Sequence, residues 1–145
     1  MEVSSIPCSG KTSYANKYFN TLNTVIISSN EIRKNLMGTY EFYEKTNNIA
    51  FDTAKDMIKE TLLEGLNVVF NAANTNCKHR KSIIKIAKEI GCKTIAIVFL
   101  SSLDTCINRN LKRSKERRVS METILNMQNS IQIESIRKVL PKLNI

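Results

Sequence analysis

The sequence lacks several features that would place it in well-known protein classes. It has no apolar run close to the roughly 20 residues that a membrane-spanning helix requires. Its first residues lack the basic region and apolar stretch of a signal peptide, so we expect a cytoplasmic protein with no membrane partner. The four cysteines are scattered without CxxC spacing, and the one histidine, His79, has no second ligand near it in sequence. A zinc site is therefore disfavoured, and reduced thiols are expected.

Acidic residues are also scarce. The chain has 13 Asp and Glu against 22 Lys and Arg, which gives a net charge of +9. A positive field of this size favours polyanions such as nucleotides, nucleic acid or a membrane surface, although a basic surface can also serve solubility alone. With 145 residues, 42% of them hydrophobic, the chain can bury a real core, and we expect one domain over residues 1–145.

Short apolar runs alternate with segments of helical periodicity along the chain. We expect strands at 3–6, 25–28, 67–70 and 94–100, with a connection at 39–46. Helices are expected at 11–20, 32–37, 48–63, 78–90, 103–111 and 121–139. This order predicts an α/β fold with a central parallel sheet of four to five strands and helices on both faces.

A phosphate-binding loop is predicted between the first strand and the first helix. Residues 5–12 match the P-loop pattern G-x-x-x-x-G-K-[ST] at seven of eight positions, the exception being Ser5. Gly10 allows backbone N–H groups to close around phosphate, Lys11 can reach the β- and γ-phosphates, and Thr12 offers a hydroxyl to Mg²⁺. ATP and Mg²⁺ are the expected cofactors. The predicted nucleotide-binding residues of this segment are Pro7, Cys8, Ser9, Gly10, Lys11, Thr12 and Ser13.

Other segments extend the pattern over nearly the whole chain. They are SSNEIR at 28–33, FDTAK at 51–55, NAAN at 71–74 and a basic stretch at 109–119. In order and spacing, these segments and the P-loop resemble the polynucleotide-kinase-like P-loop kinases. The resemblance implies a P-loop kinase fold with a basic lid. It also implies ATP-dependent transfer of the γ-phosphate to a hydroxyl, with the 5′-OH end of a polynucleotide as the expected acceptor.

The acceptor motif departs from that family. The family reads Asp-x-x-Arg after the second strand, where Asp is the general base and Arg holds the acceptor's phosphate. Arg33 matches the Arg, whereas Asn30 stands in place of the Asp. An amide can accept a hydrogen bond from a hydroxyl but cannot take its proton near neutral pH. Glu31 is adjacent, but neighbouring helical residues point about 100° apart, so we do not expect it to fill the same position.

A second departure follows the third strand. The family reads Asp-x-Thr-Asn there, whereas this chain has Asn71-Ala72-Ala73-Asn74, without the acidic residue and the hydroxyl. The resemblance assigns Asn71 and Asn74, with Arg33, to the acceptor side. The site becomes more electropositive but lacks an obvious base. Because general-base help is typically worth about 10²–10⁴-fold, we expect weakened rather than forbidden catalysis.

The basic charge is concentrated in one short segment. Residues 109–118, called the lid below, hold six basic residues and one acidic residue, more than half of the net +9. The resemblance makes this segment the lid over ATP, in which Arg113 contacts the donor phosphates and Arg109 precedes it on the same helix face. A solvated basic turn is the alternative. Direct contact with nucleic acid is a further option for Lys112, Lys115 and Arg117.

Two alternatives to a polynucleotide kinase remain open from the sequence. One is a small-molecule kinase of the same fold, because nothing in the acceptor region decides the substrate. The other is a catalytically silent protein that binds nucleotide or nucleic acid, which Asn30 and Asn71 support. The aromatic residues Tyr40, Phe42 and Tyr43 can either stack on an acceptor base or pack against the protein.

Overall fold

The strands form one parallel sheet. The computed structural model describes residues 2–4, 6–73 and 77–130. Within them, four strands lie in the order β2-β3-β1-β4: β1 (Glu2–Ser4), β2 (Thr24–Ser28), β3 (Asn67–Asn71) and β4 (Ala96–Val98). All three pairings are parallel, and β1 and β4 have three residues each. The sheet is therefore small, and the carboxyl ends of its strands all lie on the same side of the sheet.

The helices follow the predicted order with shifted ends. They are α1 (Lys11–Phe19), α2 (Ser29–Met37), α3 (Glu44–Leu63), α4 (Cys77–Ile90), α5 (Leu103–Leu111) and α6 (Met121–Ser130), with a 3₁₀ turn η1 (Lys115–Arg117). α2 and α3 begin earlier than predicted, so the connection between them is shorter. The part of the predicted helix 121–139 after Ser130 lies outside the described residues.

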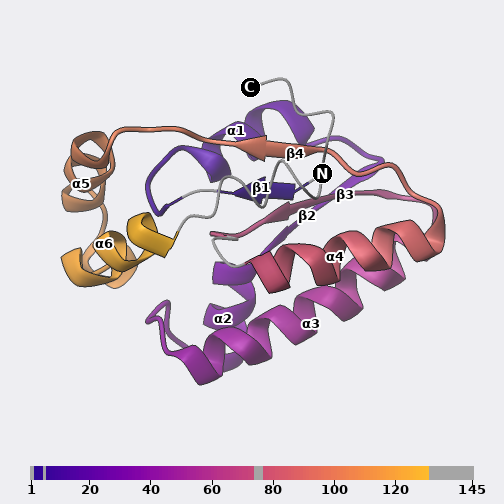
Figure 1. Cartoon of the computed structure of the whole chain (residues 1–145), viewed down its shortest axis with the longest axis horizontal. Helices are drawn as coiled ribbons and strands as arrows, with labels where there is room; N and C mark the ends of the chain where they lie inside the picture. The colour runs from indigo at the N-terminus through magenta and orange to yellow at the C-terminus, as the bar shows by residue number, and fades with distance from the viewer. Residues whose placement is uncertain (1, 5, 74–76, 131–145) are drawn as a thin grey trace.

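Helices cover both faces of the sheet, as the sequence predicts. Successive side chains of a strand point to opposite faces, and β3 shows this alternation. Phe70 packs against Phe51 of α3 with ring centroids 5.6 Å apart. Its neighbour Val69 instead packs in a cluster with Ala15 of α1. In Figure 1, α3 and α4 run side by side along one face, and α1 lies on the opposite side of the sheet. The central strand β3 is thus buried on both faces.

The segment with the strongest strand signal forms a shorter strand than predicted. Residues 94–100 read TIAIVFL, yet only Ala96–Val98 are in the sheet. Among the described residues, β4 lies at the edge of the sheet and pairs with β1 through three residue pairs. An edge strand has a partner on one side alone, and the side chains of β4 are only half-buried. An apolar composition by itself therefore did not set the length of this strand.

A separate apolar cluster packs the P-loop against α5 and α6, the two helices on either side of the lid turn. Ile6 and Cys8 are buried with Cys106 of α5 and Ile124 of α6. Figure 1 shows α5 and α6 beyond the carboxyl ends of β1 and β4. Ligands of parallel α/β sheets bind outside the carboxyl ends of the strands. This cluster therefore fixes the lid-bearing helix next to the expected ligand edge.

The main core predicts the effect of truncating Phe70, which is 1% exposed. We expect Phe70→Ala to lower the free energy of unfolding by about 3–5 kcal/mol, because it removes ring contacts and leaves a cavity between β3 and α3. Urea denaturation followed by circular dichroism measures the change. Leu22→Ala is the control, since Leu22 is 101% exposed and should unfold like the unmodified chain. Equal loss in both variants would contradict the assigned core.

Candidate functional site

The P-loop adopts a tightly curled backbone. Gly10 precedes α1 with φ 102°, and Cys8 has φ 65°, so both lie in the left-handed region. Glycine reaches this region without the steric cost that Cβ imposes, which explains Gly10, whereas Cys8 adopts it despite its side chain. Backbone curls of this kind, followed by a helix N-terminus, build concavities for anions. The predicted phosphate loop is therefore present as a folded unit, although Ser5 lies outside the described residues.

Lys11 is folded back into this loop and is 9% exposed. Its Nζ donates hydrogen bonds to the Ile6 carbonyl at 2.7 Å and to Ser9 Oγ at 3.2 Å. Burial removes water from the ammonium group and lowers the pKa of Lys11 to about 8. The cation is thus held inside the loop by neutral oxygens, and its charge is sensitive to any anion that enters.

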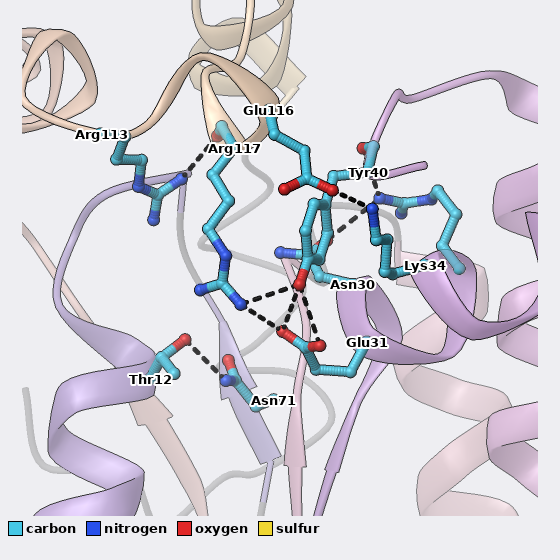
Figure 2. Close-up of polar contacts among 10 residues, drawn as sticks. Thr12, Asn30, Glu31, Lys34, Tyr40, Asn71, Arg113, Glu116 and Arg117 are labelled. Carbon is cyan, nitrogen blue, oxygen red and sulfur yellow. Dashed lines mark hydrogen bonds and ion pairs between the residues drawn. The ribbon is translucent and has the colours of Figure 1, made fainter. Parts of the chain in front are cut away.

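Thr12 meets an amide where the family has a carboxylate. Asn71 ends β3, is buried, and donates from Nδ2 to Thr12 Oγ1 at 2.9 Å, as Figure 2 shows. No group of three or more His, Cys, Asp or Glu side chains comes together within the described parts of the chain. The Thr12 hydroxyl is an oxygen ligand of the kind that a hard cation such as Mg²⁺ accepts.

Arg33 lies buried on α2, at 4% exposure. It donates to Asn30 Oδ1 at 3.1 Å and to Asn47 Oδ1 at 2.9 Å, and its guanidinium carbon lies 5.3 Å from the centre of the Phe42 ring. These partners are neutral, and no carboxylate of the described residues forms an ion pair with Arg33. Burial lowers the pKa of Arg33. A buried cation without a protein counter-charge is well suited to an anionic ligand.

The lid begins on a helix that touches the P-loop. Arg109 of α5 donates to the Cys8 carbonyl at 3.3 Å. Asn110 Oδ1 accepts a hydrogen bond from the Cys8 thiol at 3.7 Å and from the Val119 N–H at 3.0 Å. Its Nδ2 donates to the Val119 carbonyl at 2.7 Å. Arg113 is half-buried, and its Nη1 donates to the carbonyl of Arg117 at 3.5 Å. Both ends of the lid are therefore tied to the P-loop through one asparagine.

The far side of the lid docks on α2. Lys34 forms an ion pair with Glu116, and Arg117 forms one with Glu31 at 2.9 Å. The same guanidinium donates to the Tyr40 hydroxyl at 2.8 Å and lies over its ring at 4.8 Å. Figure 2 shows these contacts spanning the space between the lid and α2. The lid is therefore in contact with both sides of the site.

One cavity collects these groups. It has a volume of about 1800 Å³, above the roughly 300–1,000 Å³ of a usual small-molecule site, so it has room for two ligands. Asn74 lies outside the described residues. The predicted residues that line the cavity are Pro7, Cys8, Ser9, Gly10, Lys11, Thr12, Ser13, Asn30, Arg33, Asn71, Arg109 and Arg113.

One contributor to this site, Asn47, was missed from the sequence, and the contact between Tyr40 and Arg117, which were named there in other roles, was not predicted. Asn47 binds Arg33 from 14 positions away, and Tyr40 and Arg117 meet although they are 77 positions apart. No local pattern marks such partners, because their contacts exist only after α2, α3 and the lid have packed together. The aromatic residues Phe42 and Tyr43 line the cavity and are exposed at 42% and 56%, so they do not belong to the core.

The lowered pKa of Lys11 predicts that the protein takes up a proton when it binds an anion. The pKa of Lys11 is lowered from 10.5 to about 8, so at pH 9 most molecules hold the neutral amine. Phosphates nearby favour the charged form, and we expect ATP to bind at pH 9 with uptake of up to about one proton. Calorimetry in buffers of different ionisation enthalpy measures this uptake. Lys11→Met should abolish it and the exposed Lys17→Met should not; identical uptake in both would contradict the assignment.

Described residues contain no helix with the length and apolar character needed to cross a bilayer.

Comparison with solved structures shows the fold. The chain matches a chain in a structure described as the Pnkp1/Rnl/Hen1 RNA repair complex, with TM-score 0.75 and 14% identity, over 99% of this chain and 45% of that one. This chain therefore spans less than half the length of that protein. It also matches APE1195, with TM-score 0.62 and 14% identity over 99% and 95% of the two chains.

A further match is the tunicamycin resistance protein of Deinococcus radiodurans, with TM-score 0.59 and 15% identity over 92% and 82% of the two chains. No protein in the curated collection matches this sequence. The family model described as an AAA domain matches residues 6–133. The chain therefore belongs to this AAA domain family and has the α/β fold of the polynucleotide-kinase-like P-loop kinases.

Proposed function

We propose that the protein is a kinase that transfers the γ-phosphate of ATP to a hydroxyl, with the 5′-OH end of a polynucleotide as acceptor. One observation carries this proposal. A single cavity contains a curled P-loop with buried Lys11 and, on α2, a buried Arg33 that forms no ion pair within residues 2–4, 6–73 and 77–130. Two separate cationic positions in one cavity suit two phosphate-bearing ligands, which is what a phosphoryl transfer between nucleotides requires.

On the donor side, Lys11, Arg109 and Arg113 would surround the phosphates of ATP. The P-loop backbone and Ser13 complete this wall of the cavity. Guanidinium groups bind phosphate oxygens in pairs and stabilise the charge that develops during transfer. Mg²⁺ bound with the nucleotide would neutralise phosphate charge, and Thr12 would be its protein ligand.

On the acceptor side, Arg33 would hold a phosphate of the strand, and Asn71 would lie near the reacting end. Phe42 and Tyr43 offer exposed rings to a nucleobase on the same wall of the cavity. Asn74 would join this side by the family pattern. The net charge of +9 and the fold shared with a chain of an RNA repair complex support a polynucleotide over a neutral acceptor.

Two other functions are favoured by particular observations. The amides of Asn30 and Asn71 are engaged by Arg33 and Thr12, which favours a silent nucleotide- or nucleic-acid-binding protein. The likeness to a tunicamycin resistance protein favours a small-molecule kinase. The first predicts ATP binding without transfer, and the second predicts transfer to a small hydroxyl compound but not to an oligonucleotide.

Phosphate transfer is the direct test of the proposed function. We expect label from [γ-³²P]ATP to appear, with Mg²⁺ present, on a single-stranded oligonucleotide with a 5′-OH end. Lys11→Met should lower the rate by about 100-fold or more, because it removes the cation inside the P-loop. Lys17→Met, at the surface of the same helix, should react like the unmodified chain. An oligonucleotide with a 5′-phosphate is the acceptor control, and labelling of both oligonucleotides would contradict end-specific transfer.

Asn71→Asp tests the consequence of the missing carboxylate. The change places a negative oxygen beside the Thr12 hydroxyl, where Asn71 now donates at 2.9 Å. We expect the Mg²⁺ concentration for half-maximal activity to fall several-fold, because a carboxylate attracts a hard cation more strongly than an amide does. A titration of Mg²⁺ at fixed ATP measures this concentration. Asn48→Asp, which adds the same charge at an exposed position lining the cavity, should have little effect.

A further inference from the structure

A carboxylate lines the cavity next to the position of the missing family base. Glu31 follows Asn30 on α2, and its side chain is 50% exposed. The Tyr40 hydroxyl lies 3.1 and 3.3 Å from its two oxygens, and Arg117 donates to Oε1 at 2.9 Å. In Figure 2 the carboxylate points toward these two groups. Contacts from two other segments of the chain therefore fix where this carboxylate lies.

Asn30 itself is committed to another role. Its Oδ1 accepts a hydrogen bond from Arg33 at 3.1 Å, so the amide helps to hold the buried guanidinium. An amide oxygen has no useful basicity near neutral pH. Asn30 can therefore support the acceptor side of the site, but the proton of an acceptor hydroxyl needs a different destination.

Two other described carboxylates line the cavity, and each belongs elsewhere. Glu41 accepts the Tyr43 hydroxyl at 2.6 Å within its own loop. Glu44 is the first residue of α3, where a negative charge favours the helix N-terminus. Glu31 differs from both because it shares α2 with Arg33 and is contacted by the lid.

The lid couples this carboxylate to the donor side. Arg113 and Arg117 lie on the same short segment, and Arg113 donates to the Arg117 carbonyl at 3.5 Å. A carboxylate has about four lone-pair positions, so the contacts from Tyr40 and Arg117 leave capacity for a substrate hydroxyl. A docked lid therefore brings a donor-side arginine and a fixed carboxylate to one cavity.

We propose that Glu31 is the general base of the reaction, in place of the family carboxylate at the position of Asn30; this inference rests on the proposed kinase function. The acceptor hydroxyl oxygen forms a bond to the γ-phosphorus, and the bond from that phosphorus to the β,γ-bridging oxygen breaks. ADP leaves with the bonding electrons. The hydroxyl proton passes to Glu31 and then to water, while Tyr40 and Arg117 act as positioning residues.

Steady-state kinetics of matched glutamine variants test this role. Glu31→Gln should lower kcat by about 100-fold or more with the KM for ATP changed less than about threefold, and should remove the acid limb of the kcat–pH profile. Glu116→Gln breaks the other contact of the lid with α2 but keeps Glu31, so it should raise the KM for ATP and retain the acid limb. Glu44→Gln, a cavity carboxylate outside this proposal, should match the unmodified chain.

Rescue separates a base from a structural contact. Asn30→Asp combined with Glu31→Gln returns a carboxylate to the family position, and we expect kcat to recover by about 10-fold or more. If the unmodified chain is active and Glu31→Gln has the same kcat, the role of Glu31 is overturned and the kinase function stands. Equal changes in Glu31→Gln and Glu116→Gln would show that Glu31 serves only to dock the lid. An unmodified chain that binds ATP but labels no acceptor would overturn the kinase function and this inference together.

Discussion

The site depends on two buried cations, Lys11 and Arg33, and Arg33 forms no ion pair with a carboxylate of the described residues. Both are nearly inaccessible to water; Lys11 donates to the Ile6 carbonyl and to Ser9 Oγ, and Arg33 donates to the amide oxygens of Asn30 and Asn47. Burial lowers the pKa of each, which indicates that the fold holds these cations at a cost. An arrangement of this kind is retained when a ligand brings negative charge to the site. The amides of Asn30 and Asn47 accept hydrogen bonds from the two terminal nitrogens of Arg33 without neutralising its charge, so the attraction for an anion is preserved.

The ion pairs of the site lie at its rim rather than at its centre. Arg117 with Glu31 and Lys34 with Glu116 join the lid to α2, and all four side chains are at least partly exposed. Exposed pairs contribute little to stability, so this contact can open and close. On the other side, Asn110 and the cluster around Cys106 hold α5 firmly to the P-loop. The lid is thus fixed at the donor side and reversible at the acceptor side, an arrangement that suits binding of one ligand after the other.

Much of this arrangement was predictable because its signals are local. The match to the P-loop pattern around Gly10 and the alternation of strands and helices placed the phosphate loop at the carboxyl edge of a parallel sheet, and the family match and structural likeness confirm this fold. Strand length was less predictable. Only three residues of the apolar run 94–100 form β4, and all three pair with the neighbouring strand β1. The start of α2 at Ser29 was predicted three residues too late, although Ser28, its N-cap residue, is of a type that favours helix starts.

The sequence alone determined the residue types: a lysine after a loop glycine, an arginine at the acceptor position, amides where the family has carboxylates, and a basic lid. Only the tertiary structure decided what these residues do to one another. It directed the oxygen of Asn30 to Arg33, joined the amide of Asn71 to Thr12, and brought Glu31 between Tyr40 and Arg117. The contacts of Asn71 with Thr12 and of Glu31 with Arg117 join residues that are 59 and 86 positions apart. They depend on how α2, β3 and the lid pack around one cavity, and short-range patterns in a sequence carry no record of that packing.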